Sequence, residues 1–204
     1  MHSQAHDVGA PTLLEALRTG TATLHVALEK RLPFFSERLD AKWYRCLLQA
    51  YYGFYAPMEA MLSDSALIPD GFDSALRVKT PTLLNDLYAI GLDDDAISAL
   101  PRCAELPAFN TAAACLGALY VLEGATLGGQ VLRREMAQRL NINADNGGAF
   151  LNIYGAETGR RWKDFLDYLG RLPLDARAKQ HAVDAACSTF SCFEQWLDSQ
   201  EVLL

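Results

Sequence analysis

Hydrophobic residues recur along most of this chain at intervals of three and four, the spacing of one helical face rather than of a strand. The first such stripe follows Thr12 and Glu15, whose spacing is that of an N-terminal capping box, and it ends before Pro33. Its members are Leu14, Leu17, Thr21, Leu28 and Leu32. The pattern therefore predicts a helix from about residue 12 to residue 32.

A second helix is predicted over residues 41–62, because large apolar side chains again share one face. These side chains are Trp43, Leu47, Tyr51, Phe54, Met58 and Met61. Gly53 and Pro57 lie inside this stretch and are expected to bend it. Over residues 65–106 we expect only short helices or turns, because prolines and glycines interrupt the pattern repeatedly.

The rest of the chain is also helical in pattern. A long helix is predicted over residues 109–140, closed by a loop rich in Asn and Gly at 141–148, and two more follow at 156–172 and 174–204. The last of these has one apolar side formed by Val183, Cys187, Phe190, Phe193 and Leu197. Because strand alternation and internal repeats are both missing from the pattern, we expect an all-α fold.

Length and composition suit one helical domain over residues 12–204, preceded by a frayed tail at 1–11 that has no Lys or Arg and no apolar core. With 18 basic and 25 acidic residues the net charge is −7, which argues against nucleic-acid binding. No apolar run approaches the roughly 20 residues of a membrane span. Five scattered cysteines without C-x-x-C spacing predict no disulfide framework or zinc site. We therefore expect a cytoplasmic protein.

His25 is the first candidate for chemistry. It lies on the same side of its helix as Arg18 and Leu28, with Glu29 one turn later, close enough to organise the imidazole N–H. A metal-binding histidine usually has its second nitrogen held in this way. Arg18 lies about 10 Å before His25 along the axis, at about 1.5 Å per residue. From the residues alone, a surface histidine or a satisfied one is the more common outcome of such a pattern.

The second candidate is the stretch Y-V-L-E-G-A-T-L-G-G-Q at residues 120–130, inside the longest helix. Gly124, Gly128 and Gly129 together cost on the order of 3 kcal/mol of helix propensity, so something should offset them. Either a large flat ligand lies against the backbone there, or another helix packs closely through the small residues. Pattern alone leaves these two readings open.

Two groups of basic residues come later in the chain. Arg160, Arg161 and Lys163 begin a predicted helix and either contact an anionic ligand or lie in solvent. Arg133, Arg134 and Arg139 follow the glycines and would suit docking of an acidic electron donor. Because the whole chain is acidic, an anionic ligand would need such a local cluster.

Taken together, these motifs resemble the heme oxygenase family, and within it the bacterial members that supply biliverdin to bacteriophytochromes. R-T-G-T-A-T-L-H-V-A-L-E (residues 18–29) is similar to the proximal-helix motif, and residues 120–130 are similar to the glycine-rich distal helix. Y-Y-G-F-Y-A-P-M-E (51–59) and Y-G-A-E-T-G-R-R-W (154–162) are similar to two further signatures. The resemblance implies a bundle in which heme is sandwiched between a proximal helix and a kinked distal helix.

The resemblance also implies roles for individual residues. His25 would ligate the heme iron, Glu29 would orient it, and Gly124, Gly128 and Gly129 would press on the distal face of the heme. Arg18 and Tyr120 would contact the heme propionates, and Arg161 and Lys163 lie near the position of a further basic contact. Where mammalian members have a distal aspartate that anchors water, this chain has Ala125, which leaves that network unassigned.

The implied activity is cleavage of heme, which is both substrate and cofactor, to biliverdin, CO and ferrous iron, using O2 and electrons from a ferredoxin or a reductase. The biliverdin would pass to a bacteriophytochrome. Two alternatives stay open: a heme-binding carrier or sensor without turnover, which Ala125 would suit, and a helical interaction protein that binds no heme. No nucleic-acid or membrane partner is expected.

Overall fold

The computed structural model describes residues 11–68 and 72–204, and within them every regular element is a helix, as the sequence predicts. The long helices are α1 (Leu13–Arg31), α2 (Ala41–Ser63), α5 (Ala112–Leu140), α6 (Thr158–Arg171) and α7 (Ala176–Ser199). Shorter ones are α3 (Thr80–Ala89), α4 (Asp94–Ser98), η1 (Pro33–Phe35), η2 (Ala75–Arg77), η3 (Phe150–Asn152) and η4 (Gly155–Glu157). Of the predicted tail, all but Pro11 lies outside the described residues.

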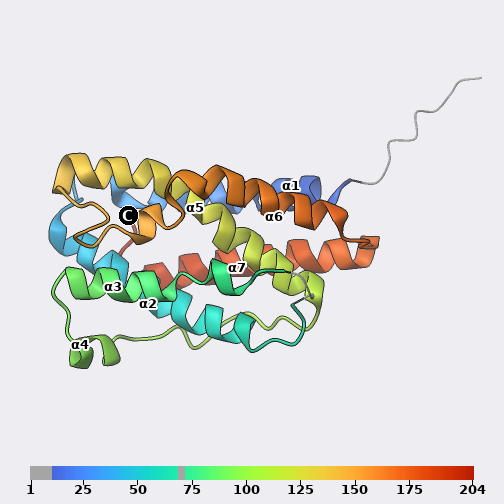
Figure 1. Cartoon of the computed structure of the whole chain (residues 1–204), viewed down its shortest axis with the longest axis horizontal. Coiled ribbons are helices and arrows are strands. Elements are labelled where there is room, and N and C mark those ends of the chain that lie inside the picture. The colour runs from blue at the N-terminus through green and yellow to red at the C-terminus, as the bar shows by residue number, and fades with distance from the viewer. Residues whose placement is uncertain (1–10, 69–71) are drawn as a thin grey trace, which may run out of the picture.

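The C-terminal helix α7 is the centre of the bundle. It packs most extensively against α5 and α1 and also contacts α2. In Figure 1, α7 runs between an upper group of α1, α5 and α6 and a lower group of α2 and α3. The two halves of α5 run in different directions in this view, as the prediction of a kinked helix requires. The helix nevertheless keeps its helical backbone through all of its glycines.

The hydrophobic core lies on the inner faces of α2, α5 and α7. The predicted face of α2 is buried except at its ends, where Trp43 and Met61 are partly exposed. The N-terminal half of α5 is buried on nearly all sides from Ala113 to Leu122. This explains why α5 is the one described helix that is long and apolar enough to cross a membrane: 67% of its most apolar stretch is buried inside the protein.

Capping side chains set most of the helix starts. Thr12 and Glu15 form the predicted capping box, with Thr12 N–H donating to Glu15 Oε2 at 2.8 Å and Glu15 N–H to Thr12 Oγ1 at 3.2 Å. The predicted start of the long helix at residue 109 is three residues early, because Thr111 is the residue whose hydroxyl accepts the Ala114 N–H. In the same way, Asp175 begins α7 at Ala176.

The predicted ends of the last two helices are also corrected. Residues 155–157 form η4 rather than the first turn of α6. The final helix ends at Ser199 instead of residue 204, because Glu201 has a positive φ of 56°, and the Leu204 N–H then donates to the Arg31 carbonyl at 2.7 Å. That bond ties the end of the chain to the end of α1.

One glycine of α5 has a purely structural reason. A Cβ on Gly117 would lie 2.0 Å from the Ala182 carbonyl oxygen of α7, so the two backbones approach too closely for any side chain. The reading of small residues as close helix packing is therefore right for Gly117. The five cysteines are free: Cys103 and Cys115 are buried, and Cys46, Cys187 and Cys192 are partly exposed.

Candidate functional site

His25 lies on an exposed face of α1, with 55% of its side chain accessible. Its Nδ1 is 3.5 Å from Glu29 Oε2, and its ring meets the ring of Phe190 on α7 edge to face, with centroids 5.9 Å apart. In the described part of the chain Nε2 has no hydrogen-bond partner. A neutral imidazole held through Nδ1 presents Nε2 as a free ligand nitrogen.

The surroundings of His25 suit a flat apolar ligand. Helices α1 and α5 both pack on α7 but make few contacts with each other. Large apolar side chains stay exposed on both: Val26 follows His25 on α1, and Leu127 and Val131 lie next to Gly128 on α5. Exposed apolar side chains at neighbouring positions indicate a binding surface more often than scattered ones do.

The three glycines of the 124–129 stretch have three different environments. A Cβ on Gly129 would lie 2.8 Å from the carbonyl oxygen of Leu151, and one on Gly124 would lie 3.6 Å from the indole of Trp162. Gly128 has no atom within 4 Å of the Cβ position and is exposed. Packing within the protein therefore requires Gly129, whereas only Gly128 opens onto free space that a ligand would fill.

Arg18 lies about two helical turns before His25 on α1. Tyr120 of α5 lies close to Arg18. Burial raises the pKa of the Tyr120 phenol, while the nearby Arg18 charge and the Thr21 hydroxyl lower it. Arg18 is exposed and has no ion-pair partner among the described residues. The structure thus brings a cation and a phenol from two helices to one place on the α1 face that carries His25, an arrangement that suits an anionic group.

Arg161 and Lys163 are not brought to this place. Arg161 donates to the Leu76 carbonyl at 3.0 Å and lies over the Tyr154 ring, 4.7 Å from its centroid. Lys163 is exposed and pairs with Asp167 one turn along α6. The residue of α6 that does approach the glycines is Trp162, whose ring centroid is 5.6 Å from that of Tyr120.

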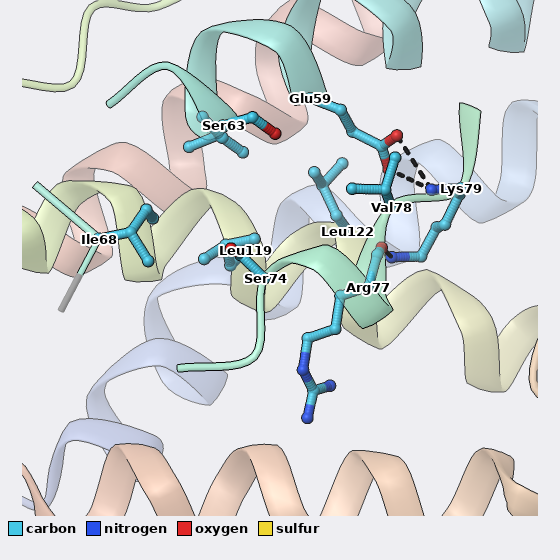
Figure 2. A pocket seen from close by; sticks show the side chains of 10 residues that line it. Glu59, Ser63, Ile68, Ser74, Arg77, Val78, Lys79, Leu119 and Leu122 are labelled. Carbon is cyan, nitrogen blue, oxygen red and sulfur yellow. Dashed lines mark hydrogen bonds between the residues drawn. The ribbon is translucent and has the colours of Figure 1, made fainter. Parts of the chain in front are cut away.

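Behind the glycines lies a buried charged cluster that the sequence reasoning missed. The Glu123 side chain is only 1% exposed; it pairs with Lys79 at 2.6 Å and with Arg77, and it accepts the Tyr154 hydroxyl at 3.0 Å. Glu59 accepts the backbone N–H of Lys79 at 2.9 Å, as Figure 2 shows beside a small cavity. A carboxylate within the apolar run before Gly124 was the available signal.

A cavity of about 50 Å³ lies on the inner side of α5 at Ala125, Thr126 and Gly129. Tyr51 and Tyr55 line it, and neither hydroxyl has a hydrogen-bond partner among the described residues. Lys79 lines the cavity as well. Tyrosine hydroxyls that make no hydrogen bond to protein beside a cavity of this size fit bound water.

These features fit heme as the ligand. Nε2 of His25 is a nitrogen that could ligate iron while Nδ1 pairs with Glu29, exposed apolar side chains and Gly128 would suit a flat ring, and Arg18 with Tyr120 would suit a propionate. Among the residues that the structure describes, no three or more His, Cys, Asp or Glu side chains are grouped so that they could hold a bare metal ion.

Comparison with known proteins gives the same result. The sequence profile of the heme oxygenase family matches residues 11–199. A heme oxygenase of Xanthomonas campestris pv. campestris (strain 8004) is 30% identical over 165 residues, which are 79% of this chain and 93% of that protein.

Solved structures of heme oxygenases share the fold. The NO- and CO-bound enzyme of Neisseria meningitidis has a TM-score of 0.76 at 21% identity, over 94% of this chain and 92% of that one. Heme oxygenase-1 of the cyanobacterium Synechocystis in complex with heme has a TM-score of 0.74 at 19% identity, over 94% and 93% of the two chains. Since the family profile covers nearly the whole chain and a relative matches over most of its length, the chain belongs to the heme oxygenase family of heme-degrading oxidoreductases.

Proposed function

We propose that this chain cleaves heme with O2 and electrons to biliverdin, CO and ferrous iron, with His25 as the axial ligand of the iron. The observation that carries the proposal is the pairing of His25 Nδ1 with Glu29, which leaves Nε2 free on the face that carries Arg18. When bound, heme supplies the iron that activates O2 and the ring that is opened. Residues 12–204 would act as one domain.

The protein's own residues would orient the heme and manage water. Gly128 leaves room for the ring, and Gly124 and Gly129 keep the helix close to Trp162 and Leu151 while adding no side chain toward the ligand. Arg18 and Tyr120 would hold a propionate. With Ala125 in place of an acid, the Tyr51 and Tyr55 hydroxyls in the cavity behind it are the groups that would hold water on the distal side.

A hemin titration of the His25→Ala variant tests the ligand. Wild type should give a Soret band with one equivalent of hemin and quenching of tryptophan fluorescence. The variant should lose the wild-type Soret spectrum and regain it with added imidazole. His181→Ala, on α7, is the matched control and should behave as wild type. A variant of His25 with an unchanged spectrum would overturn the assignment.

Turnover separates the enzyme from a heme carrier or sensor. With ascorbate or a ferredoxin–reductase system in air, the Soret band should disappear while biliverdin absorbance grows, and chromatography should identify the isomer. A stable ferric or oxy spectrum would instead indicate a carrier or sensor. A protein with no Soret shift at all would be a helical interaction protein.

We further propose that the protein works in the cytoplasm, takes electrons from a ferredoxin or a reductase, and passes biliverdin to a bacteriophytochrome. The motifs at residues 18–29 and 154–162 support the last step by their resemblance to bacterial members with that role. Of the three arginines considered for donor docking, all are exposed, but Arg139 donates to the carbonyls of Phe34 and Ser36 and Arg133 donates to Gln130. Arg134 is the one that makes no hydrogen bond or ion pair among the described residues.

A further inference from the structure

The glycine segment of α5, residues 124–129, has little side-chain packing of its own to fix its position. A Cβ on Gly128 would meet nothing within 4 Å, and Ala125 and Leu127 are exposed, so Thr126 is the one side chain of the segment that is buried. Yet the two residues that flank the segment, Glu123 and Gln130, both make hydrogen bonds to one short stretch of the chain, residues 150–158. This stretch contains η3, η4 and the first residue of α6.

The Gln130 end of the segment is held by hydrogen bonds from the side-chain amide. Its Nε2 donates to Asn152 Oδ1 at 3.1 Å and to Thr158 Oγ1 at 3.2 Å. Its Oε1 accepts from Arg133 Nε at 3.0 Å, which fixes the orientation of the amide. The adjacent Gly129 lies against the Leu151 carbonyl, so the backbones of α5 and η3 meet directly at this end.

The Glu123 end is held by charge. The Tyr154 hydroxyl donates to Glu123 Oε1 at 3.0 Å, beside the Lys79 ammonium at 2.6 Å from the same oxygen. The Tyr154 ring is itself fixed between two cations, 4.7 Å from the Arg161 guanidinium and 5.7 Å from the Lys79 ammonium. Arg161 therefore has a role here that does not require contact with heme.

Stability alone is a poor explanation for these groups. Replacing a buried ion pair with apolar residues of similar volume often leaves a protein equally stable or more so, whereas polar contacts can specify one arrangement. Three glycines weaken the helix at this point, because glycine has a low helix propensity. The hydrogen bonds of Glu123 and Gln130, at the two ends of the segment, fix its position against residues 150–158.

We propose that residues 150–158 clamp the glycine segment of α5 from behind, and that Glu123, Gln130 and Tyr154 are positioning residues for the reaction. They act on heme only through the α5 backbone, which they hold at a set distance and orientation. The inference rests on the proposed function for its effect on turnover, but the clamp itself is a property of the heme-free protein.

Tyr154→Phe tests the Glu123 end with little risk to the fold, because the ring and both of its cation contacts remain. Amide hydrogen exchange over residues 124–130 should accelerate about five- to tenfold in the heme-free variant, as expected for one lost hydrogen bond. Tyr168→Phe is the matched control, since the buried Tyr168 hydroxyl has no hydrogen-bond partner in the described part of the chain. Its exchange over residues 124–130 should equal that of wild type.

Gln130→Ala tests the other end. Gln180→Ala is the control, because the Gln180 amide donates one hydrogen bond to Asp184 on the exposed side of α7, away from residues 124–130. Both clamp variants should bind hemin within about twofold of wild type, lower kcat severalfold and broaden the mixture of biliverdin isomers. Unchanged exchange over 124–130, or an increase spread evenly over the whole chain, would overturn the clamp. If wild type itself lacks turnover, the proposed function fails, and exchange alone decides the clamp.

Discussion

The side chain of Glu29 is 60% exposed, yet its carboxylate lies 3.5 Å from Nδ1 of His25. Partners of metal-bound histidines set the tautomer and basicity of the ring. Glu29→Ala should therefore keep the fold, weaken hemin binding by about 10- to 100-fold and lower the iron–histidine stretching frequency of the ferrous protein. Resonance Raman spectroscopy and hemin titration would measure both.

Glu29→Gln keeps an acceptor oxygen and should fall between wild type and Glu29→Ala in affinity and in stretching frequency. If both variants bind hemin as wild type does, the 3.5 Å contact is an ordinary surface pair.

Residue roles divide into those that a local pattern predicts and those that depend on distant neighbours. The spacing of His25 and Glu29 predicts their contact because both lie on one helix, one turn apart. The separate reasons for Gly117, Gly124 and Gly129 were not predictable, since they depend on Ala182, Trp162 and Leu151 from other elements. The contact of Arg161 was not predictable for the same reason, because its partner Leu76 is 85 residues away in the sequence.

At the scale of the element, helix α5 contains glycines that close packing requires and one, Gly128, that packing does not require. Gly128→Ala should stabilise the heme-free protein by about 1 kcal/mol, because alanine favours the helix and its Cβ meets nothing. Gly117→Ala should destabilise it by about 1–3 kcal/mol, because the new Cβ overlaps the Ala182 carbonyl. Urea unfolding without heme would show the opposite signs.

A larger side chain at Gly128 tests whether the ligand occupies the open space beside this glycine. Gly128→Leu should remain folded but lose hemin binding or turnover, since the side chain would fill the open space. A Gly128→Leu variant with normal turnover would show that this space is not used by the ligand.

Element boundaries were predicted well where a cap follows the apolar stripe and poorly where it does not. Thr12 marks the start of α1 in both sequence and structure. Helix α3 is one of the short helices expected over residues 65–106, but its bounds were not predicted because Pro81 was taken as an interruption, although proline is tolerated in the first turn, where it lies. Its N-terminus is capped from another helix by Glu59, which accepts the Lys79 and Thr80 N–H groups, a contact that local sequence does not reveal.

At the scale of the whole molecule, the apolar periodicity was enough to predict the all-α class. Two features depend on tertiary contacts and were not predictable from it: the central place of α7 and the buried charges behind α5.

Several tyrosines also lie in the interior of the protein. Burial raises the pKa of Tyr51 and Tyr55, and burial together with Asp86 or Glu123 raises the pKa of Tyr44 and Tyr154.

These raised pKa values predict how stability depends on alkaline pH. Below about pH 10 the phenols are protonated in both states and add no pH dependence. Above it the unfolded chain releases protons that the folded protein keeps, so the free energy of unfolding falls as pH rises, by up to about 1.4 kcal/mol per pH unit for each such tyrosine. Urea unfolding across roughly pH 9 to 11.5, the range in which free phenols titrate, should show this decline. Tyrosinate absorbance at ~295 nm should appear together with loss of helix. Tyr51→Phe should make the decline shallower by the share of one tyrosine, and an unchanged slope in that variant would mean that the Tyr51 phenol ionises in the folded protein.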